Sequence, residues 1–266
     1  MVFTDTHCHL NLNQFDTDRD FVIRRALDAG VERMLVPGID LETSRRAIDL
    51  AEHYPAIYAA IGIHPNTPNA WDDATLDQLQ ELAAHPKVVA IGEVGLDQHW
   101  KTTDVQYQQR VFLAQLKLAA EVQKPVVVHS REALDVLFPI LMDWAKQLRS
   151  AGSPLSNHPG VLHAFEGELD RAQEAARAGF YIGLAGPVTF PNAQDKHRLS
   201  EALPLKNILI ETDSPFLTPH PYRGQRNEPA YVTLVALSLA ERQQKDIDAI
   251  AQATTVNASH LFRWSL

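Results

Sequence analysis

The chain has 266 residues, of which 45% are hydrophobic and 21% are charged, and its formal net charge is -9 at pH 7. This length is near the roughly 250 residues of one (β/α)8 barrel, so we expect one domain that spans residues 1–266. The acidic balance argues against a general phosphate-binding surface, such as the surface of proteins that coat DNA. Metal cations bound at a local site could still handle phosphate.

A single cysteine, Cys8, excludes an intrachain disulfide and fits a reducing compartment. The sequence does not open with a basic segment followed by an apolar one, so we expect no signal peptide. No apolar run approaches the roughly 18 residues of a membrane span. We therefore predict a cytoplasmic protein that makes no membrane contact. Nothing in the sequence indicates an obligate protein partner, and we expect a monomer.

Short apolar runs alternate with longer helical patterns up to about residue 213. This alternation is typical of βα units that build a parallel sheet. The predicted strands lie near residues 2–7, 33–37, 57–62, 88–92, 125–129, 160–163, 180–184 and 207–211. Eight strands, each followed by a helix or a loop, indicate an α/β fold closed into a TIM (β/α)8 barrel.

The helices are predicted from capping residues, apolar spacing, and the glycines and prolines that end them. The first begins at Asp16 or Thr17 and the third at Asp72 or Asp73. The predicted ranges are 16–29, 42–53, 72–84, 104–122, 132–149, 168–178, 229–242, 245–253 and 256–263. No helix is assigned between residues 184 and 207, and the loop 150–159 is the one candidate insertion.

The segment that follows the first predicted strand carries two histidines, His7 and His9, with Cys8 between them. Side chains alternate along an extended chain, so the two imidazoles should point the same way and Cys8 should point away from them. Neutral imidazole nitrogen is a common metal ligand. The pair alone is weak evidence, because an H-x-H segment at a strand end can equally be exposed or hydrogen-bonded.

Further polar residues follow the other predicted strands, at the end of the barrel where active sites of this fold lie. They are His64, Glu93, His129, His163, Glu211 and Asp213. Each has an ordinary alternative. His64 could belong to a loop, Glu93 to a turn between glycines, and Asp213 could cap the next turn. A carboxylate after the apolar run 89–91 would, however, be buried and would need a cation or hydrogen-bond donors.

Six of these residues together predict a cluster of four histidines and two carboxylates. Six nitrogen and oxygen ligands exceed what one tetrahedral ion uses, and they suit two divalent ions that share a bridging carboxylate. Two such ions can hold the attacking and leaving oxygens of a hydrolytic displacement. Ligation without thiolate favours Zn, Mn, Mg or Co, although four imidazoles would bind Mg only weakly.

The motifs resemble those of the TatD family of metal-dependent hydrolases. They run in the family's order along nearly the whole chain: residues 5–10, 62–65, 92–97, 129–131, 163–167, 211–215 and 222–229. The resemblance implies a TIM barrel of the metal-dependent hydrolase type and a deoxyribonuclease that acts on DNA ends. In two places the sequence departs from the family's usual residue. Glu166 stands where the family usually has serine, and Gln98 stands where it usually has an aromatic residue.

The resemblance also implies roles for individual residues. His7, His9 and Asp213 would hold one metal ion, and His129 and His163 would hold the other, with Glu93 bridging the two. Asp213 would also act in catalysis together with Glu93. The residues expected near the scissile phosphate are His64 and Arg131, and Arg223 could touch the substrate.

Our first functional hypothesis is a metal-dependent phosphodiesterase that uses a metal-activated water on DNA, with single-stranded DNA or DNA ends as the expected substrate. In this reading Asp213 orients or deprotonates the water, and Glu211 has a supporting hydrogen-bond role. A second hypothesis keeps the site but changes the substrate to an amide, a lactone or an ester. A third is a barrel that holds metal for structure and binds a partner. The sequence does not tell the polarity of an exonuclease or the identity of the metal.

Overall fold

The computed structural model describes residues 1–68, 70–100 and 102–264. Eight parallel strands pair in chain order and form a nearly closed barrel. They are β1 (Phe3–Asp5), β2 (Val31–Pro37), β3 (Ile57–Ile61), β4 (Val88–Asp97), β5 (Val126–Arg131), β6 (Gly160–Leu162), β7 (Tyr181–Leu184) and β8 (Ile208–Ile210). The amide of Thr6 donates to the carbonyl of Ile210 at 3.2 Å, which links the first and last strands. The predicted TIM barrel is confirmed.

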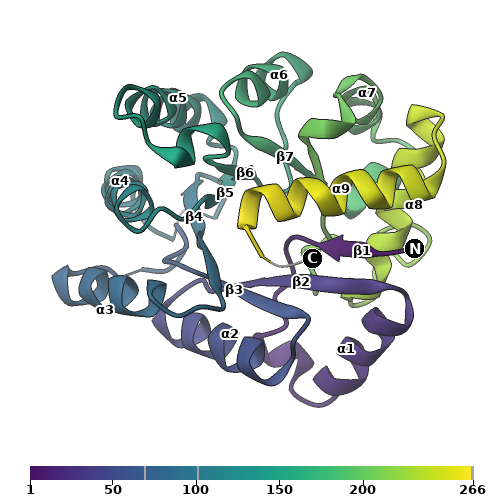
Figure 1. Ribbon diagram of the computed structural model, residues 1–266, viewed down its shortest axis with the longest axis horizontal. Coiled ribbons are helices and arrows are strands. Elements are labelled where there is room, and N and C mark those ends of the chain that lie inside the picture. Colours follow the sequence, from purple (N-terminus) through teal and green to yellow (C-terminus); the bar gives the residue numbers. More distant parts are fainter. Residues whose placement is uncertain (69, 101, 265–266) are drawn as a thin grey trace.

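Helices surround the strands (Figure 1). They are α1 (Arg19–Asp28), α2 (Leu41–His53), α3 (Asp73–Ala83), α4 (Val105–Val122), α5 (Leu134–Ser150), α6 (Leu169–Arg177), α7 (Gln194–Ala202), α8 (Val232–Gln243) and α9 (Ile247–Phe262). Short 3-10 turns are η1 (Asn13–Phe15), η2 (Pro154–Asn157), η3 (Gly186–Thr189), η4 (Leu205–Asn207) and η5 (Pro229–Tyr231). No described helix is both long and apolar enough to cross a bilayer.

Capping explains where several helices begin. The Asp72 carboxylate accepts from the amide of Thr75 at 2.7 Å, and Asp104 caps α4 in the same way. Each bond satisfies an amide that has no partner inside its helix. The first helix begins later than predicted, at Arg19. The preceding residues form the turn η1, and the carboxylate of Asp16 pairs with the guanidinium of Arg19.

Two helical predictions were wrong. Residues 247–262 form one helix where we predicted two, and the Thr254 hydroxyl donates within it to the carbonyl of Ile250 at 2.9 Å. Residues 194–202 form α7, for which no helix was predicted. Only Leu199 and Ser200 are buried in α7, so its apolar stripe is too narrow to give a helical period.

The last helix closes one end of the barrel. In Figure 1, α9 lies across the front of the strands. The side-chain amide of Asn257 in α9 donates to the carbonyl of Leu205 in η4 and to the carbonyl of Ile208 at the start of β8. Phe262 and Trp264 belong to the same buried cluster as side chains of seven strands, β2 to β8. The amino-terminal ends of the strands are therefore covered, and the carboxyl-terminal ends form the opposite face.

Candidate metal centre

His7 and His9 lie just past β1, where the chain stays extended. The amide of Cys8 donates to the carbonyl of Leu35 at 3.0 Å, and Cys8 also pairs with Ser214 in an isolated parallel bridge. This pairing turns both imidazoles to the same side, and their Nε2 atoms lie 3.1 Å apart. Cys8 points the other way, as predicted, with its sulfur 3.5 Å from the carbonyl oxygen of Leu35.

Glu93, near the middle of β4, lies between two groups of imidazoles and is 2% exposed. Its Oε2 atom lies 3.3 Å from Nε2 of His7 and 3.5 Å from Nε2 of His9. Its Oε1 atom lies 2.8 Å from Nδ1 of His129 and 3.7 Å from Nε2 of His163. The two oxygens of one carboxylate therefore face two different sets of ligand-type nitrogens.

Asp213 follows β8 and completes the cluster. Its Oδ1 atom lies 3.4 Å from Nε2 of His9 and 3.7 Å from Nε2 of both His7 and His163. The backbone of Asp213 has a φ of 57°, in the left-handed region that few non-glycine residues adopt, and its amide donates to the carbonyl of His7 at 2.8 Å. A strained backbone of this kind often occurs at functional sites. The six predicted ligand residues are thus brought together.

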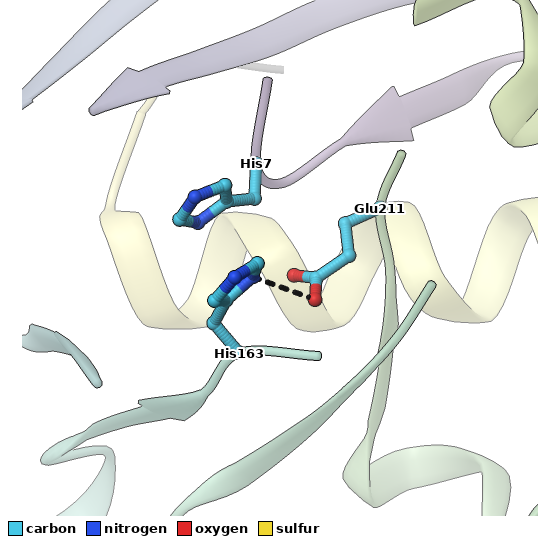
Figure 2. A group of neighbouring side chains, drawn as sticks. All are labelled: His7, His163 and Glu211. Atoms are coloured by element: carbon cyan, nitrogen blue, oxygen red, sulfur yellow. Dashed lines mark hydrogen bonds and ion pairs between the residues drawn. The ribbon is translucent and has the colours of Figure 1, made fainter. Parts of the chain in front are cut away.

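Two of the imidazoles are each held from behind by a buried carboxylate. Nε2 of His129 lies 3.0 Å from Oδ2 of Asp97, and Nδ1 of His163 lies 2.9 Å from Oε1 of Glu211. Figure 2 shows Glu211 beside His163, with the ring of His7 stacked on the ring of His163 at a centroid distance of 3.6 Å. Each imidazole therefore turns one nitrogen to the cluster and the other to a carboxylate. Such outer partners fix the orientation of a histidine that binds metal.

Asp97 was quoted in a motif but given no role by the sequence analysis. Glu93 and Asp97 are four residues apart on β4, and side chains an even number apart on a strand share a face. That spacing is the signal that could have identified Asp97. Glu211 was given a supporting role, and its bond to His163 is consistent with that expectation.

The electrostatics of the cluster follow from burial and these pairings. Burial opposes the charge on Glu93, but the imidazoles of His7 and His64 outweigh it and hold the pKa of the carboxyl well below its usual range. Burial would lower the pKa of His129, but its bonds to Asp97 and Glu93 raise it to about 9. In the same way the Glu211 carboxylate raises the pKa of His163 to about 10. Buried carboxylates around imidazoles are a donor set that attracts cations.

The sequence also assigned His64, Arg131 and Arg223 to the substrate. His64 reaches the cluster, with Nε2 3.6 Å from Oε1 of Glu93, while its Nδ1 accepts from the amide of Asn66 at 3.1 Å. The guanidinium of Arg131 lies over the ring of Trp100, 5.6 Å from the centroid. Exposed Arg223 has its guanidinium over the ring of Phe190, and no bond joins either arginine to the cluster within the described chain.

Three groups of side chains have ligand atoms that all lie within 4.8 Å of one another. They are His7, His9 and Asp213; His64, Glu93 and His129; and His7, His163 and Glu211 (Figure 2). The first of these groups is the ligand set predicted for one ion. The nitrogen and oxygen donors fit divalent cations such as Zn or Mn, with no thiolate among them. The residues present therefore fit a metal centre.

Comparison with known proteins agrees with this geometry. A family model described as TatD related DNase matches residues 4–263. The chain belongs to the TatD family of metal-dependent hydrolases. It is 44% identical over 259 residues to an uncharacterized metal-dependent hydrolase, YabD, of Bacillus subtilis, covering 97% of this chain and 98% of the relative.

Two further relatives extend the comparison. The chain is 38% identical over 269 residues to a protein of Escherichia fergusonii named 3'-5' ssDNA/RNA exonuclease TatD, which covers 97% of this chain and 98% of that relative. The crystal structure of YjjV, a TatD homologue from Escherichia coli K12, superposes with a TM-score of 0.90 at 35% identity and covers 99% and 98% of the two chains. The resemblance seen in the sequence is confirmed, and this TatD-family chain is a metal-dependent hydrolase.

Proposed function

We propose that this chain is a nuclease that hydrolyses phosphodiester bonds of single-stranded DNA from an end. The observation that carries the proposal is Glu93, whose two oxygens face two sets of imidazoles. A carboxylate in that position suits two ions about 3.5–4 Å apart, the arrangement found in many enzymes that cleave phosphodiesters. The name of the relative from Escherichia fergusonii, 3'-5' ssDNA/RNA exonuclease, supports the same class of substrate.

In this proposal His7, His9 and Asp213 would hold one divalent ion. His129 and His163 would hold the second ion, and Glu93 would contribute to holding both. Bound divalent ions supply Lewis acidity toward water and toward the phosphate oxygens. Zn, Mn and Co suit these nitrogen donors, and Mg would bind weakly.

The chain's own residues would handle the proton and the phosphate charge. Burial opposes the charge on Asp213, but the bond from His9 and the nearby imidazoles outweigh it and lower its pKa, so this carboxylate is ionised and can accept a proton from water. Burial lowers the pKa of His64, and Nδ1 of that ring already accepts from the amide of Asn66. Neutral His64 therefore carries its proton on Nε2, where it can donate to a phosphate oxygen. Arg131 and Arg223 would add positive charge near the substrate.

Metal analysis joined to a labelled-oligonucleotide digest tests the proposal. Protein purified without chelator should contain about two divalent ions per chain, the number suited to six ligands of this kind. It should shorten a single-stranded oligonucleotide one nucleotide at a time, and chelator should stop the digestion. Labels at the 5' and 3' ends would give the polarity. Rapid hydrolysis of small esters or lactones by metal-loaded protein that leaves DNA and RNA intact would refute the proposal and favour the alternative hydrolase.

We further propose that the chain acts as a monomeric single domain in the cytoplasm. One eight-stranded sheet takes up all the strands of the described residues, which supports a single domain. The proposed cytoplasmic location is supported by the single cysteine, Cys8, which is buried and free, because a protein without disulfides fits a reducing compartment. Sedimentation of the purified protein would test the oligomeric state.

A further inference from the structure

Two large aromatic side chains stand exposed at the face of the barrel that carries the metal centre. Trp100 follows β4 and is 60% exposed, and Phe216 follows β8 and is 48% exposed. Because the eight strands pair in chain order, the segments after β4 and β8 lie half a turn apart around the barrel. The two rings therefore stand on opposite sides of the metal centre.

The backbone of Trp100 is fixed to the cluster through Asp97. Oδ1 of Asp97 accepts from the amide of His99 at 2.9 Å and from the amide of Trp100 at 3.1 Å. Oδ2 of the same carboxylate pairs with Nε2 of His129 at 3.0 Å. One buried carboxylate thus separates the Trp100 backbone from a proposed metal ligand, and the exposed indole is held by an ordered turn.

The positively charged side chain of Arg131 lies beside the indole of Trp100. The guanidinium of Arg131 lies 5.6 Å from the centroid of the Trp100 ring, and the ring of His99 meets the same indole edge-to-face at 5.0 Å. No carboxylate lies within 4.0 Å of the Arg131 guanidinium among the residues the structure describes. An aromatic face beside an arginine is the combination that proteins use for a base and its phosphate in a single strand.

Phe216 is fixed to the other side of the cluster. Its amide donates to the carbonyl of Asp213 at 2.8 Å, and the Asn227 amide group donates to the carbonyl of Phe216 at 2.6 Å. The Phe216 ring lies 6.0 Å from the ring of His9, centroid to centroid, at an angle of 71°. The backbone of Phe216 is thus bonded directly to a proposed ligand residue, whereas that of Trp100 is bonded to Asp97 behind His129.

We propose that Trp100 and Phe216 are stacking platforms for the two bases that flank the scissile phosphate, an inference that rests on the proposed nuclease function. Every base has a face that can stack, so such platforms tolerate any sequence. A base in a duplex is already stacked and paired, so these platforms favour single strands. Stacking also explains how a chain with a net charge of -9 could hold nucleic acid without a basic surface.

The test compares an intact single-stranded oligonucleotide with one that is abasic at its last two positions, because the abasic strand keeps the phosphates and removes what would stack. Trp100→Leu and Phe216→Leu should each raise the KM for the intact strand by about 5- to 150-fold, the range for loss of one stacked base. The preference for the intact over the abasic strand should shrink in both variants. Trp100→Phe should restore most of that preference. The matched control is Phe21→Leu, because Phe21 is equally exposed at 60% but lies on α1.

Binding of the oligonucleotide can be measured separately from its cleavage, through tryptophan fluorescence. The intact oligonucleotide should quench tryptophan fluorescence in the metal-loaded protein and in Phe21→Leu, and the quenching should be lost in Trp100→Phe. If the unmodified enzyme cleaves both strands with the same KM and shows no quenching, the stacking inference is wrong although the nuclease proposal stands. If it cleaves neither strand, the nuclease proposal is wrong, and the quenching titration alone decides whether bases stack on Trp100.

Discussion

Replacing Glu211 with glutamine would remove one buried negative charge behind His163 and leave the hydrogen bonds there in place. Oε1 of Glu211 accepts from Nδ1 of His163 at 2.9 Å and also from the amide of Ala164. A glutamine carbonyl at the Oε1 position keeps both bonds. Its amide group would then face the Thr6 hydroxyl, which lies 3.4 Å from Oε2 and can accept. We therefore expect Glu211→Gln to fold normally.

The expected effect is on metal affinity. Loss of a carboxylate behind a metal-binding histidine typically lowers affinity by about 10- to 100-fold. Glu211 is fully buried, and its charge acts on His163 with little screening by water, so we expect the upper end. A 100-fold loss corresponds to about 2.8 kcal/mol of binding free energy. At saturating metal the number of bound ions and most of the activity should return.

A chelator competition followed by elemental analysis measures this effect. The alternative is that Glu211 is itself a ligand, since its Oε1 atom belongs to one of the three groups of close ligand atoms (Figure 2). In that case Glu211→Gln would lose one ion per chain at every metal concentration. An unchanged metal affinity in Glu211→Gln would also refute the reasoning, because it would mean that His163 does not bind metal through Nε2.

Four other perturbations test the site. Glu93→Ala should lower metal content and reduce activity by orders of magnitude with the barrel still folded, and full activity at normal metal content would exclude the bridging role. Asp213→Asn should retain most DNA binding while turnover falls about 10²–10⁴-fold in single-turnover assays. Glu166→Ser removes an exposed carboxylate that lines a cavity of about 300 Å³ together with His163, so the KM for an oligonucleotide should fall, and an unchanged KM would place Glu166 away from the substrate. The imidazoles of His129 and His163, with pKa values of about 9 and about 10 in metal-free protein, should release protons when metal binds at pH 7. Calorimetry in two buffers would detect that release, and metal affinity should rise with pH up to about 10, the higher of the two pKa values.

The sequence predicted the barrel well, because most of the strands contain a buried apolar run. Val126, Val127 and Val128 have no exposed surface and are followed at once by His129, and the same pattern occurs before Glu93. A polar residue that ends such a run must lie where the barrel opens, so strand ends and site residues are predicted together. The barrel then brings residues as far apart in the sequence as His7 and Asp213 into one cluster.

Other features depend on contacts between residues that lie far apart in the sequence. Asp97 and Glu211 act behind the histidines, and the partner of each lies more than 30 residues away in the sequence. The helix α7 buries only a narrow stripe, so its residues show little apolar periodicity. Arg226 lies in the same motif, residues 222–229, as Arg223, but its guanidinium makes two bonds to the carboxylate of Asp18. The sequence does not distinguish Arg226, which is paired with a carboxylate, from Arg131, which lies over an aromatic ring; only the folded structure does.

Charge balance offers an independent reason to expect two ions. Four carboxylates stand in or directly behind the cluster, those of Glu93, Asp97, Glu211 and Asp213, and the most exposed of these side chains is 13% exposed. A fifth buried carboxyl, that of Asp5, has its pKa raised to about 8 by burial, so it is mostly neutral at pH 7. Buried charge is costly unless it is compensated. When the four histidines are neutral ligands, two divalent ions carry the four positive charges that offset the four carboxylates, whereas a single ion would leave two negative charges in the barrel. Those two negative charges would also repel the phosphate of a nucleic acid. The site should therefore accept an anionic substrate only when both divalent ions are bound.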